Sequence, residues 1–291
     1  MLQYVMIILD LNQIMISNVL QQLGNHTNVE IEENLVRHMV LNSIRNLKTK
    51  YKSYGQLVIA CDDKKYWRRE QFPAYKGNRK KDREKSEIDW TNLFNTLNTI
   101  KQDLKEYFPY PIIQVDGAEA DDVIGSLVAE FGVPLNSSSA EKILILSGDK
   151  DFVQLQSYVN VSQYDPIHKK NITCKDPAQF LKELVLKGDR GDGIPNVLSP
   201  DNCLIEGIRQ KPLTAKKMAE LLAVDPSTYN PEIRANFMRN NSLIDLTFTP
   251  KTISEAVIEQ YNAQQDKPRD KLFNYFVKHK LKTLIESINE F

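Results

Sequence analysis

The sequence predicts an α/β fold with a mostly parallel central sheet and helices on both of its faces. Short apolar, β-branched runs typical of buried strands alternate in the first half of the chain with longer segments of helical periodicity. Strands separated by helices in this way form parallel sheets. In addition, the predicted strands end in carboxylates, and ligands of such sheets bind beyond the carboxyl ends of the strands.

The composition describes a chain of 291 residues with an ordinary apolar fraction and no net charge. This length suits one large domain or two modest ones, and zero net charge excludes a strongly basic signature over the whole chain. The three cysteines show no CxxC spacing, which predicts free thiols in a reducing compartment. No signal peptide and no apolar run of membrane-spanning length is evident, so we expect a cytoplasmic protein with no membrane partner.

Two strands open the chain. The first is the apolar run Tyr4–Leu9, which ends at Asp10, and the second is Leu57–Cys61, which ends at Asp62. An amphipathic helix is expected between them, from about residue 31 to about residue 54, closed by Gly55. A single carboxylate after a strand is commonly a turn or N-cap residue, and for Asp10 alone that interpretation stays open.

A basic segment, Lys64–Lys85, follows the second strand. It holds ten Lys and Arg residues against three Asp and Glu, and Tyr66, Trp67, Phe72 and Tyr75 are interleaved with them. A charge run alone is typical of a solvated loop. Aromatic rings beside cations suit a nucleic acid, because cations meet phosphates and rings stack on exposed bases. The segment therefore predicts contact with a phosphate backbone.

The acidic motif Val115–Asp122 follows a predicted strand and leads into the helix Val123–Phe131. The partial positive charge at a helix N-terminus accommodates one or two acids. Glu119, Asp121 and Asp122, however, fall within four residues, and like charges so close raise one another's pKa unless a cation lies between them. The motif therefore indicates either a helix start or a divalent metal site.

The other elements of this half continue the pattern. They are the helix Trp90–Phe108, the strands Tyr110–Val115 and Lys142–Leu146, a serine-rich loop at Asn136–Ala140 and an edge strand at Val159–Gln163. The strand Lys142–Leu146 leads directly into Asp149 and Asp151. With Asp10, Asp62 and the acidic motif, these residues would place about seven carboxylates on one edge of the sheet, where cations are needed to hold them.

The second half of the chain is mainly helical. Phe180–Lys187 is predicted as a helix, Gly188–Pro195 as a glycine-rich turn and Thr214–Val224 as a helix with Thr214 as its N-cap. Three or four further helices are expected after it. The N–H groups of such a turn can hold a phosphate, and a plain interhelical loop is the alternative.

Together these motifs resemble the flap endonuclease family of metal-dependent 5′ nucleases, which have a PIN-like fold, and most closely its small T-even-phage members. The resemblance rests on Asp10, Cys61-Asp62, Tyr66–Arg69, Tyr75–Arg79, Glu119–Asp122, Ser147–Phe152, Gly188–Pro195 and the closing Ser287–Phe291, all in family order. The sequence departs from the family after Pro195. There Asn196 replaces a glycine, and Leu198–Gln210 is longer than in the family and poorer in the expected second glycine-rich turn.

The resemblance implies a mixed central sheet, a flexible helical arch at about residues 63–88 and a helix–three-turn–helix element at about residues 180–225 that holds duplex DNA. Residues 1–175 would form the nuclease domain and residues 176–291 a helical DNA-binding domain. The implied activity is 5′→3′ exonuclease and flap endonuclease hydrolysis at 5′ ends, flaps and RNA primers in DNA replication.

The resemblance also implies two Mg²⁺ ions, for which Mn²⁺ would substitute, acting on the phosphodiester. By motif match the metal ligands would be Asp10, Asp62, Glu119, Asp121, Asp122, Asp149, Asp151, Asp189 and Asp192. The catalytic residues would be Lys76, Arg79, Asp122 and Asp149, with the two cations stabilising charge at the scissile phosphate. The DNA-binding residues would be Arg68, Arg69, Tyr75, Lys76, Arg79, Gly191 and Gly193, with Tyr75 stacking on the terminal base.

The implied partners are DNA and RNA–DNA with 5′ ends, flaps or branches, bound by a monomer in the host-cell cytoplasm. A single-strand DNA-binding protein and a sliding clamp are implied by analogy. Two alternatives stay open. A Toprim-type enzyme would hold Mg²⁺ with Glu119, Asp149 and Asp151, although it leaves Asp10 and Asp62 unexplained. A DNA-structure-binding module without catalysis would bind a flap and leave it uncut.

Overall fold

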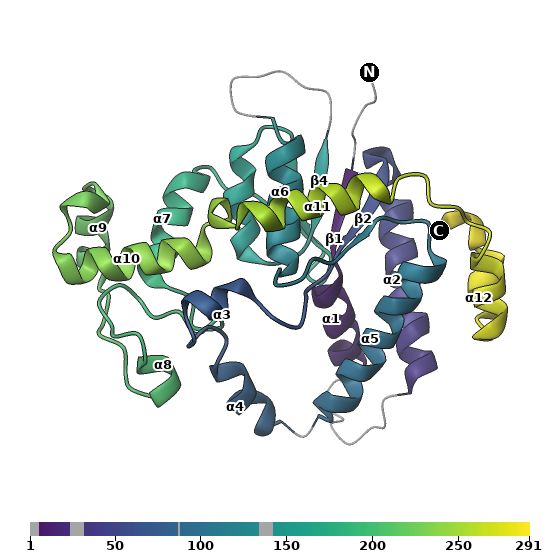
Figure 1. The fold of residues 1–291 in the computed structure, drawn as a ribbon, viewed down its shortest axis with the longest axis horizontal. Coiled ribbons are helices and arrows are strands. Elements are labelled where there is room, and N and C mark those ends of the chain that lie inside the picture. Colours follow the sequence, from purple (N-terminus) through teal and green to yellow (C-terminus); the bar gives the residue numbers. More distant parts are fainter. Residues whose placement is uncertain (1–5, 24–31, 87, 134–141) are drawn as a thin grey trace.

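The computed structural model describes residues 6–23, 32–86, 88–133 and 142–291, around a six-stranded sheet (Figure 1). Its strands are β1 (Met6–Asp10), β2 (Gln56–Ala60), β3 (Ile112–Ile113), β4 (Ile143–Leu146), β5 (Val161–Asp165) and β6 (Lys170–Ile172), in the order β3-β2-β1-β4-β5-β6. Every neighbouring pair is parallel except β5 and β6. The predicted mixed, mostly parallel sheet is therefore confirmed. The predicted loop Asn136–Ala140 lies outside the described residues.

Helices cover both faces of the sheet, as the continuous apolar strands predicted. Alternate side chains of β1 point to opposite faces, so Ile7 and Leu9 join one core while Met6 and Ile8 join the other. The first core is closed by α1 (Leu11–Leu23), α2 (Glu33–Lys50), α5 (Trp90–Tyr107), α12 (Leu272–Lys278) and α13 (Lys282–Glu286). The second is closed by α6 (Ala120–Phe131), the 3-10 helix η2 (Lys150–Ser157) and α11 (Lys251–Ala263), which packs along α6.

Three local expectations need correction. Helix α1 follows β1 directly and was not predicted, because its apolar positions continue those of the strand without a turn. The helix expected up to residue 54 ends at Lys50, and a 3-10 turn, η1 (Lys52–Tyr54), leads to Gly55, whose φ of 81° confirms its role as a terminator. Strand β5 lies inside the sheet, because the unpredicted polar strand β6 forms the edge beside it.

The basic segment forms two helices, α3 (Trp67–Gln71) and α4 (Asn78–Glu84). Four helices of the second half lie together on one side of the sheet (Figure 1): α7 (Pro177–Lys187), α8 (Cys203–Glu206), α9 (Ala215–Leu222) and α10 (Pro231–Ile244). The predicted cap is confirmed, since the Thr214 hydroxyl accepts from the Lys217 amide at 3.2 Å. Three further 3-10 turns are η3 (Pro226–Thr228), η4 (Leu246–Phe248) and η5 (Ile288–Glu290). None of the described helices is long and apolar enough to cross a membrane.

The two halves of the chain are packed against each other. Phe72 and Tyr75 of the basic segment share a core with α7, α9 and α10. At the other end of the molecule, α12 and the buried C-terminal Phe291 belong to the core on the first face of the sheet. The division into domains at residues 175 and 176 stays a prediction.

Candidate metal and nucleic-acid site

The carboxyl ends of the parallel strands bring several acids to one edge of the sheet. Asp10 ends β1, Asp62 stands two residues after β2, Glu119 is the N-cap of α6, and Asp149 is the N-cap of η2. Hydrogen bonds hold these ends together. Asp62 Oδ1 accepts from the Ala120 amide at the start of α6 at 2.6 Å, and Asp10 Oδ2 accepts from the hydroxyl of Ser147, just after β4, at 3.1 Å.

The acids at this edge are close enough to perturb one another. Burial and the charges of Asp62 and Asp149 raise the pKa of Asp10 to about 7. Burial and the charge of Asp149 raise the pKa of Asp121 well above its ordinary value, and the same two causes raise the pKa of Asp151. Crowded carboxylates of this kind are stabilised in the charged form when a cation lies between them.

Asp151 offers one donor atom of the kind that a divalent cation binds. Asp151 Oδ1 is buried and has no hydrogen-bond partner, and the nearby Lys150 ammonium lies 4.0 Å from it. A carboxylate oxygen in this position is suited to a hard cation such as Mg²⁺. As the side chains stand, no three His, Cys, Asp or Glu residues of the described segments lie close enough together to hold an ion. Part of the reason is that protein cations already contact several of the carboxylates.

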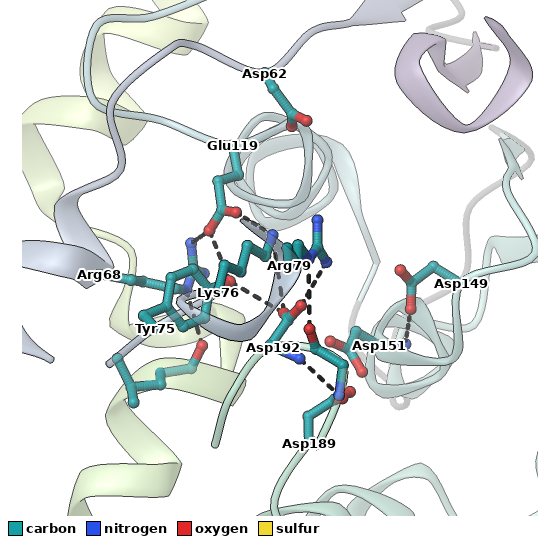
Figure 2. A network of polar contacts seen from close by, with 12 residues as sticks. Asp62, Arg68, Tyr75, Lys76, Arg79, Glu119, Asp149, Asp151, Asp189 and Asp192 are labelled. Atoms are coloured by element: carbon teal, nitrogen blue, oxygen red, sulfur yellow. Dashed lines mark hydrogen bonds and ion pairs between the residues drawn. The ribbon is translucent and has the colours of Figure 1, made fainter. Parts of the chain in front are cut away.

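Glu119 is surrounded by donors from the basic segment (Figure 2). It accepts from Arg68 Nη1 at 2.9 Å and from the Tyr75 hydroxyl at 2.9 Å, and the Lys76 ammonium forms an ion pair with its other oxygen. All four side chains are buried. A buried ion pair contributes little net stability but is costly to break, so these contacts fix the position of Glu119.

Asp192, in the glycine-rich turn after α7, faces the same donors from the other side (Figure 2). Arg79 Nη2 lies 2.6 Å from its Oδ1, and the Tyr75 hydroxyl lies 3.1 Å from its Oδ2. Burial alone would raise the pKa of Asp192, but Lys76 and Arg79 bring it below the ordinary value. The single proton of the Tyr75 hydroxyl is thus shared between Glu119 and Asp192, which belong to different halves of the chain.

The turn and the basic segment are also in backbone contact. The Lys76 amide donates to the Asp192 carbonyl at 2.7 Å, and Lys76 itself has a φ of 55°. Gly193 has a φ of 75°, and a Cβ there would lie 2.8 Å from the Ala74 carbonyl oxygen. Only glycine allows this approach, so the turn places Asp192 against the start of α4.

Asp122 lies deeper than a metal ligand would. It is fully buried, and its oxygens accept from Trp67 Nε1 at 3.1 Å, from Arg68 at 2.8 Å and from the Thr249 hydroxyl at 2.9 Å. It also accepts from the Glu119 amide, which completes a capping box at the start of α6. The placement does not support Asp122 as a ligand or catalytic group, because its acceptors are already used by the protein.

Two predicted DNA contacts also need correction. Arg68 is 1% exposed and donates to Glu119, Asp122 and a backbone carbonyl, so it cannot reach DNA. Tyr75 is 2% exposed, and its buried ring has no face to offer a base. The aromatic and basic composition of the segment predicted exposed side chains, whereas these two pack inward. Of the other predicted contacts, Arg69 and Arg79 are exposed.

The glycine amides of the turn are used within the turn. The Gly191 amide donates to Asp189 Oδ1 at 2.7 Å, and the Gly193 amide donates to the Arg190 carbonyl at 3.2 Å. The expectation that Gly191 and Gly193 hold a phosphate through these N–H groups therefore needs correction. The glycines serve the tight path of the backbone instead.

Four further residues belong to the site and were not predicted. Gln13 accepts from the Ser147 hydroxyl at 3.1 Å and from the Gly148 amide at 2.6 Å, and Lys150 forms an ion pair with Asp189. Ser147 and Lys150 are polar residues inside the motif Ser147–Phe152, so the sequence could have identified them as part of the site. Gln13 lies in the unpredicted α1, and Thr249 is remote in sequence from Asp122, so neither gave a local signal.

The chain matches two family models. The first describes a 5′-3′ exonuclease N-terminal, resolvase-like domain and matches residues 7–184, and the second describes the T4 RNase H C-terminal region and matches residues 180–291. Among curated relatives, the ribonuclease H of Enterobacteria phage T4 is 35% identical over 98% of this chain and 95% of its own length. Flap endonuclease Xni of Shewanella woodyi is 31% identical over 51% of this chain and 56% of its own length.

Solved structures show the same fold. The flap endonuclease of bacteriophage T5, in a pseudo-enzyme–product complex with DNA and metal ions, aligns with a TM-score of 0.60 at 18% identity, over 88% of this chain and 99% of that one. The T5 D15 protein co-crystallised with metal ions gives the same TM-score over 89% of this chain and 98% of that one.

Proposed function

Because the chain belongs to the 5′-3′ exonuclease family, in the branch that includes the phage T4 ribonuclease H, we propose that it hydrolyses phosphodiesters at 5′ ends, flaps and RNA primers of replicating DNA. The chain is a nuclease of a family that depends on divalent metal ions. The observation that carries the proposal is the convergence of acids from four strand ends, with the pKa of Asp10, Asp121 and Asp151 raised by burial and crowding.

Two Mg²⁺ ions are proposed, with Mn²⁺ as a substitute. Asp10, Asp62, Asp121 and Asp149 would hold the first, and Asp151, Asp189 and Asp192 the second. Glu119 would join either ion only if the Lys76 ammonium left its carboxylate. When bound, such ions supply an activated water and stabilise the leaving oxygen. Asp122 would act through Glu119 and Arg68 as a positioning residue, in place of the ligand role expected from its motif.

In this proposal, two cations of the basic segment both neutralise acids of the site and contact the substrate phosphate. Lys76 and Arg79 neutralise Glu119 and Asp192, and they also lie where a scissile phosphate would meet the acids. Cations fixed by such pairs need little reorganisation when charge develops on the phosphate. Arg69 and Arg79, both exposed, remain suited to hold the phosphate backbone of the substrate.

The substrate proposed is DNA or RNA–DNA with a 5′ end, flap or branch, bound by a monomer in the cytoplasm of the host cell. A single-strand DNA-binding protein and a sliding clamp are proposed as partners. The nuclease domain would span residues 1–175 and the DNA-binding domain residues 176–291. The family match favours a 5′ nuclease over the Toprim-type alternative.

A cleavage assay tests the proposal. A forked duplex with a labelled 5′ flap is incubated with the protein and Mg²⁺, and the same reaction with EDTA is the control. Metal-dependent release of short products from the 5′ side is the expected result. Tight binding of the fork with no product in Mg²⁺ or Mn²⁺ would support the non-catalytic module instead.

A further inference from the structure

Two consecutive acids, Asp62 and Asp63, follow β2, and only the first was assigned to the metal site. The two side chains have different partners. Asp62 Oδ1 accepts from the Ala120 amide at the start of α6 at 2.6 Å, whereas Asp63 Oδ2 accepts from the Gly117 amide at 2.9 Å. Asp63 therefore contacts the loop that leads into α6.

The contact between Asp63 and this loop runs in both directions. The Asp63 amide donates to the Ala118 carbonyl at 2.9 Å, while the Asp63 carboxylate accepts from Gly117. Gly117 has a φ of 78°, a conformation that favours glycine, and the Trp67 amide donates to its carbonyl at 2.9 Å. Three hydrogen bonds from residues 63–67 thus fix the turn before α6.

The Asp63 carboxylate is itself held by the residue that follows β3. Asp63 Oδ1 accepts from Gln114 Nε2 at 3.2 Å. The other end of the same amide is also fixed, because the Lys105 ammonium donates to Gln114 Oε1 at 2.8 Å. The orientation of the Asp63 carboxylate therefore depends on where β3 holds Gln114.

Helix α11 fixes the free edge of β3. This strand is the outermost of the sheet, so its outward N–H and C=O groups have no neighbouring strand. The Gln260 side chain accepts from the Gln114 N–H at 3.2 Å and donates to the Gln114 carbonyl at 2.9 Å. Gln264 makes the same pair of bonds with Ile112, at 3.0 and 3.1 Å. The two glutamines lie one helical turn apart and together take the place of a neighbouring strand.

A continuous set of contacts therefore runs from α11 to the candidate metal ligands. Helix α11 holds β3, the residue after β3 holds Asp63, and Asp63 holds the turn before α6. This turn sets the start of α6, which carries Asp121 and supplies the Ala120 amide to Asp62. Residues that orient metal ligands influence metal affinity strongly even though they do not touch the ion.

We propose that Asp63 is a positioning residue of the metal site. Its carboxylate holds the Gly117 turn and thereby sets the distance between Asp62 and the acids at the start of α6, while Asp63 itself binds no metal ion. The proposal rests on the proposed nuclease function and adds to it. It also gives α11, from the second half of the chain, a part in holding the metal ligands.

Metal affinity measured without DNA tests this role. Binding of Mn²⁺ is followed by isothermal titration calorimetry for the wild type, Asp63→Ala and Asp63→Asn. Asparagine removes the charge but keeps an oxygen for the Gly117 amide, and the Gln114 amide can turn to accept from its Nδ2. Asp116→Ala is the matched control, because Asp116 is an exposed acid of the same loop and forms no hydrogen bond or ion pair with the other residues that the structure describes.

Asp63→Ala should weaken Mn²⁺ binding by about 10- to 100-fold, as for the loss of other groups that orient metal ligands. Asp63→Asn and the control should bind Mn²⁺ nearly as tightly as the wild type. Wild-type affinity in Asp63→Ala would overturn the proposal. So would an Asp63→Asn variant as weak as Asp63→Ala, because Asp63 would then act only through its charge. If circular dichroism shows that Asp63→Ala does not fold, Gln114→Met repeats the comparison and should weaken binding in the same direction; unchanged affinity there would also overturn the proposal.

Amide hydrogen exchange in EDTA separates this proposal from the proposed function. The Ala120 amide, from which Asp62 accepts, should exchange faster in Asp63→Ala and at the wild-type rate in Asp63→Asn. Unchanged exchange in Asp63→Ala would refute the role of Asp63. A wild type that binds no Mn²⁺ would instead refute the proposed metal site.

Discussion

Asp10→Asn should stabilise the fold at neutral and alkaline pH while it impairs metal binding. The pKa of Asp10 lies at about 7 in the folded chain, against 3.8 ordinarily, because of burial and the charges of Asp62 and Asp149. At about 1.4 kcal/mol per pH unit, this interval sets an upper limit of about 4 kcal/mol. Asparagine keeps the hydrogen bonds, since the Ser147 hydroxyl can accept from its amide and donate to Gln13, 3.1 Å away.

The direction in which the stability changes with pH follows from proton binding by Asp10. Between pH 3.8 and about 7 the folded chain holds the Asp10 proton more tightly than the unfolded chain does. The stability of the wild type that depends on this group is therefore fully present below pH 3.8 and is lost as the pH rises to about 7. A neutral asparagine does not share this loss. Between pH 5.5 and pH 8 the advantage of Asp10→Asn should grow by about 2 kcal/mol.

Urea unfolding followed by circular dichroism at pH 5.5 and pH 8, in EDTA, measures this change. Asp270→Asn, at an exposed position, is the matched control and should show no pH-dependent gain. At pH 8, added Mg²⁺ should stabilise the wild type more than the variant, because ligand binding stabilises the folded state. An advantage of Asp10→Asn that is equal at the two pH values would refute the reasoning that Asp10 is destabilised by its neighbours.

Three other substitutions test the rest of the site. Asp149→Asn should abolish cleavage of a labelled flap while affinity for DNA in EDTA is retained, and undiminished cleavage would exclude Asp149 from the metal site. Lys76→Ala should lower kcat by about 10²–10³-fold, as for the loss of one preorganised donor, with a smaller change in KM; a change confined to KM would make Lys76 a positioning contact. Arg68→Met should destabilise the fold by about 3–5 kcal/mol in urea unfolding, because Glu119 and Asp122 would be left buried without their partner; a loss below about 1 kcal/mol would show that the two acids do not depend on Arg68.

The sheet and its acidic edge could be predicted from the sequence because both depend on local patterns. Continuous apolar runs such as Leu57–Cys61 identify strands buried on two faces, and the acid that follows each run marks its carboxyl end. The edge strand β6 was not predictable in this way, because its residues Lys170–Ile172 are polar and partly exposed. Its strand character comes from pairing with β5.

The burial of Arg68, Tyr75 and Asp122 was beyond local patterns. Basic and acidic side chains are ordinarily exposed, so Arg68 was assigned to DNA and Asp122 to a metal ion. Each is buried because partners far away in the sequence satisfy it. Arg68 donates to the carbonyl of Leu243, and Asp122 accepts from Thr249.

The Tyr75 hydroxyl, placed between Glu119 and Asp192, has a consequence for how such proteins can be recombined. One proton on a side chain of the basic segment serves an acid from the α/β half and an acid from the turn after α7. Consider a chimaera that takes one of these three segments from a relative with a different residue in place of Tyr75, Glu119 or Asp192. It would leave a buried polar side chain without its hydrogen-bond partner. Exchange between relatives should therefore succeed only when all three segments are exchanged together.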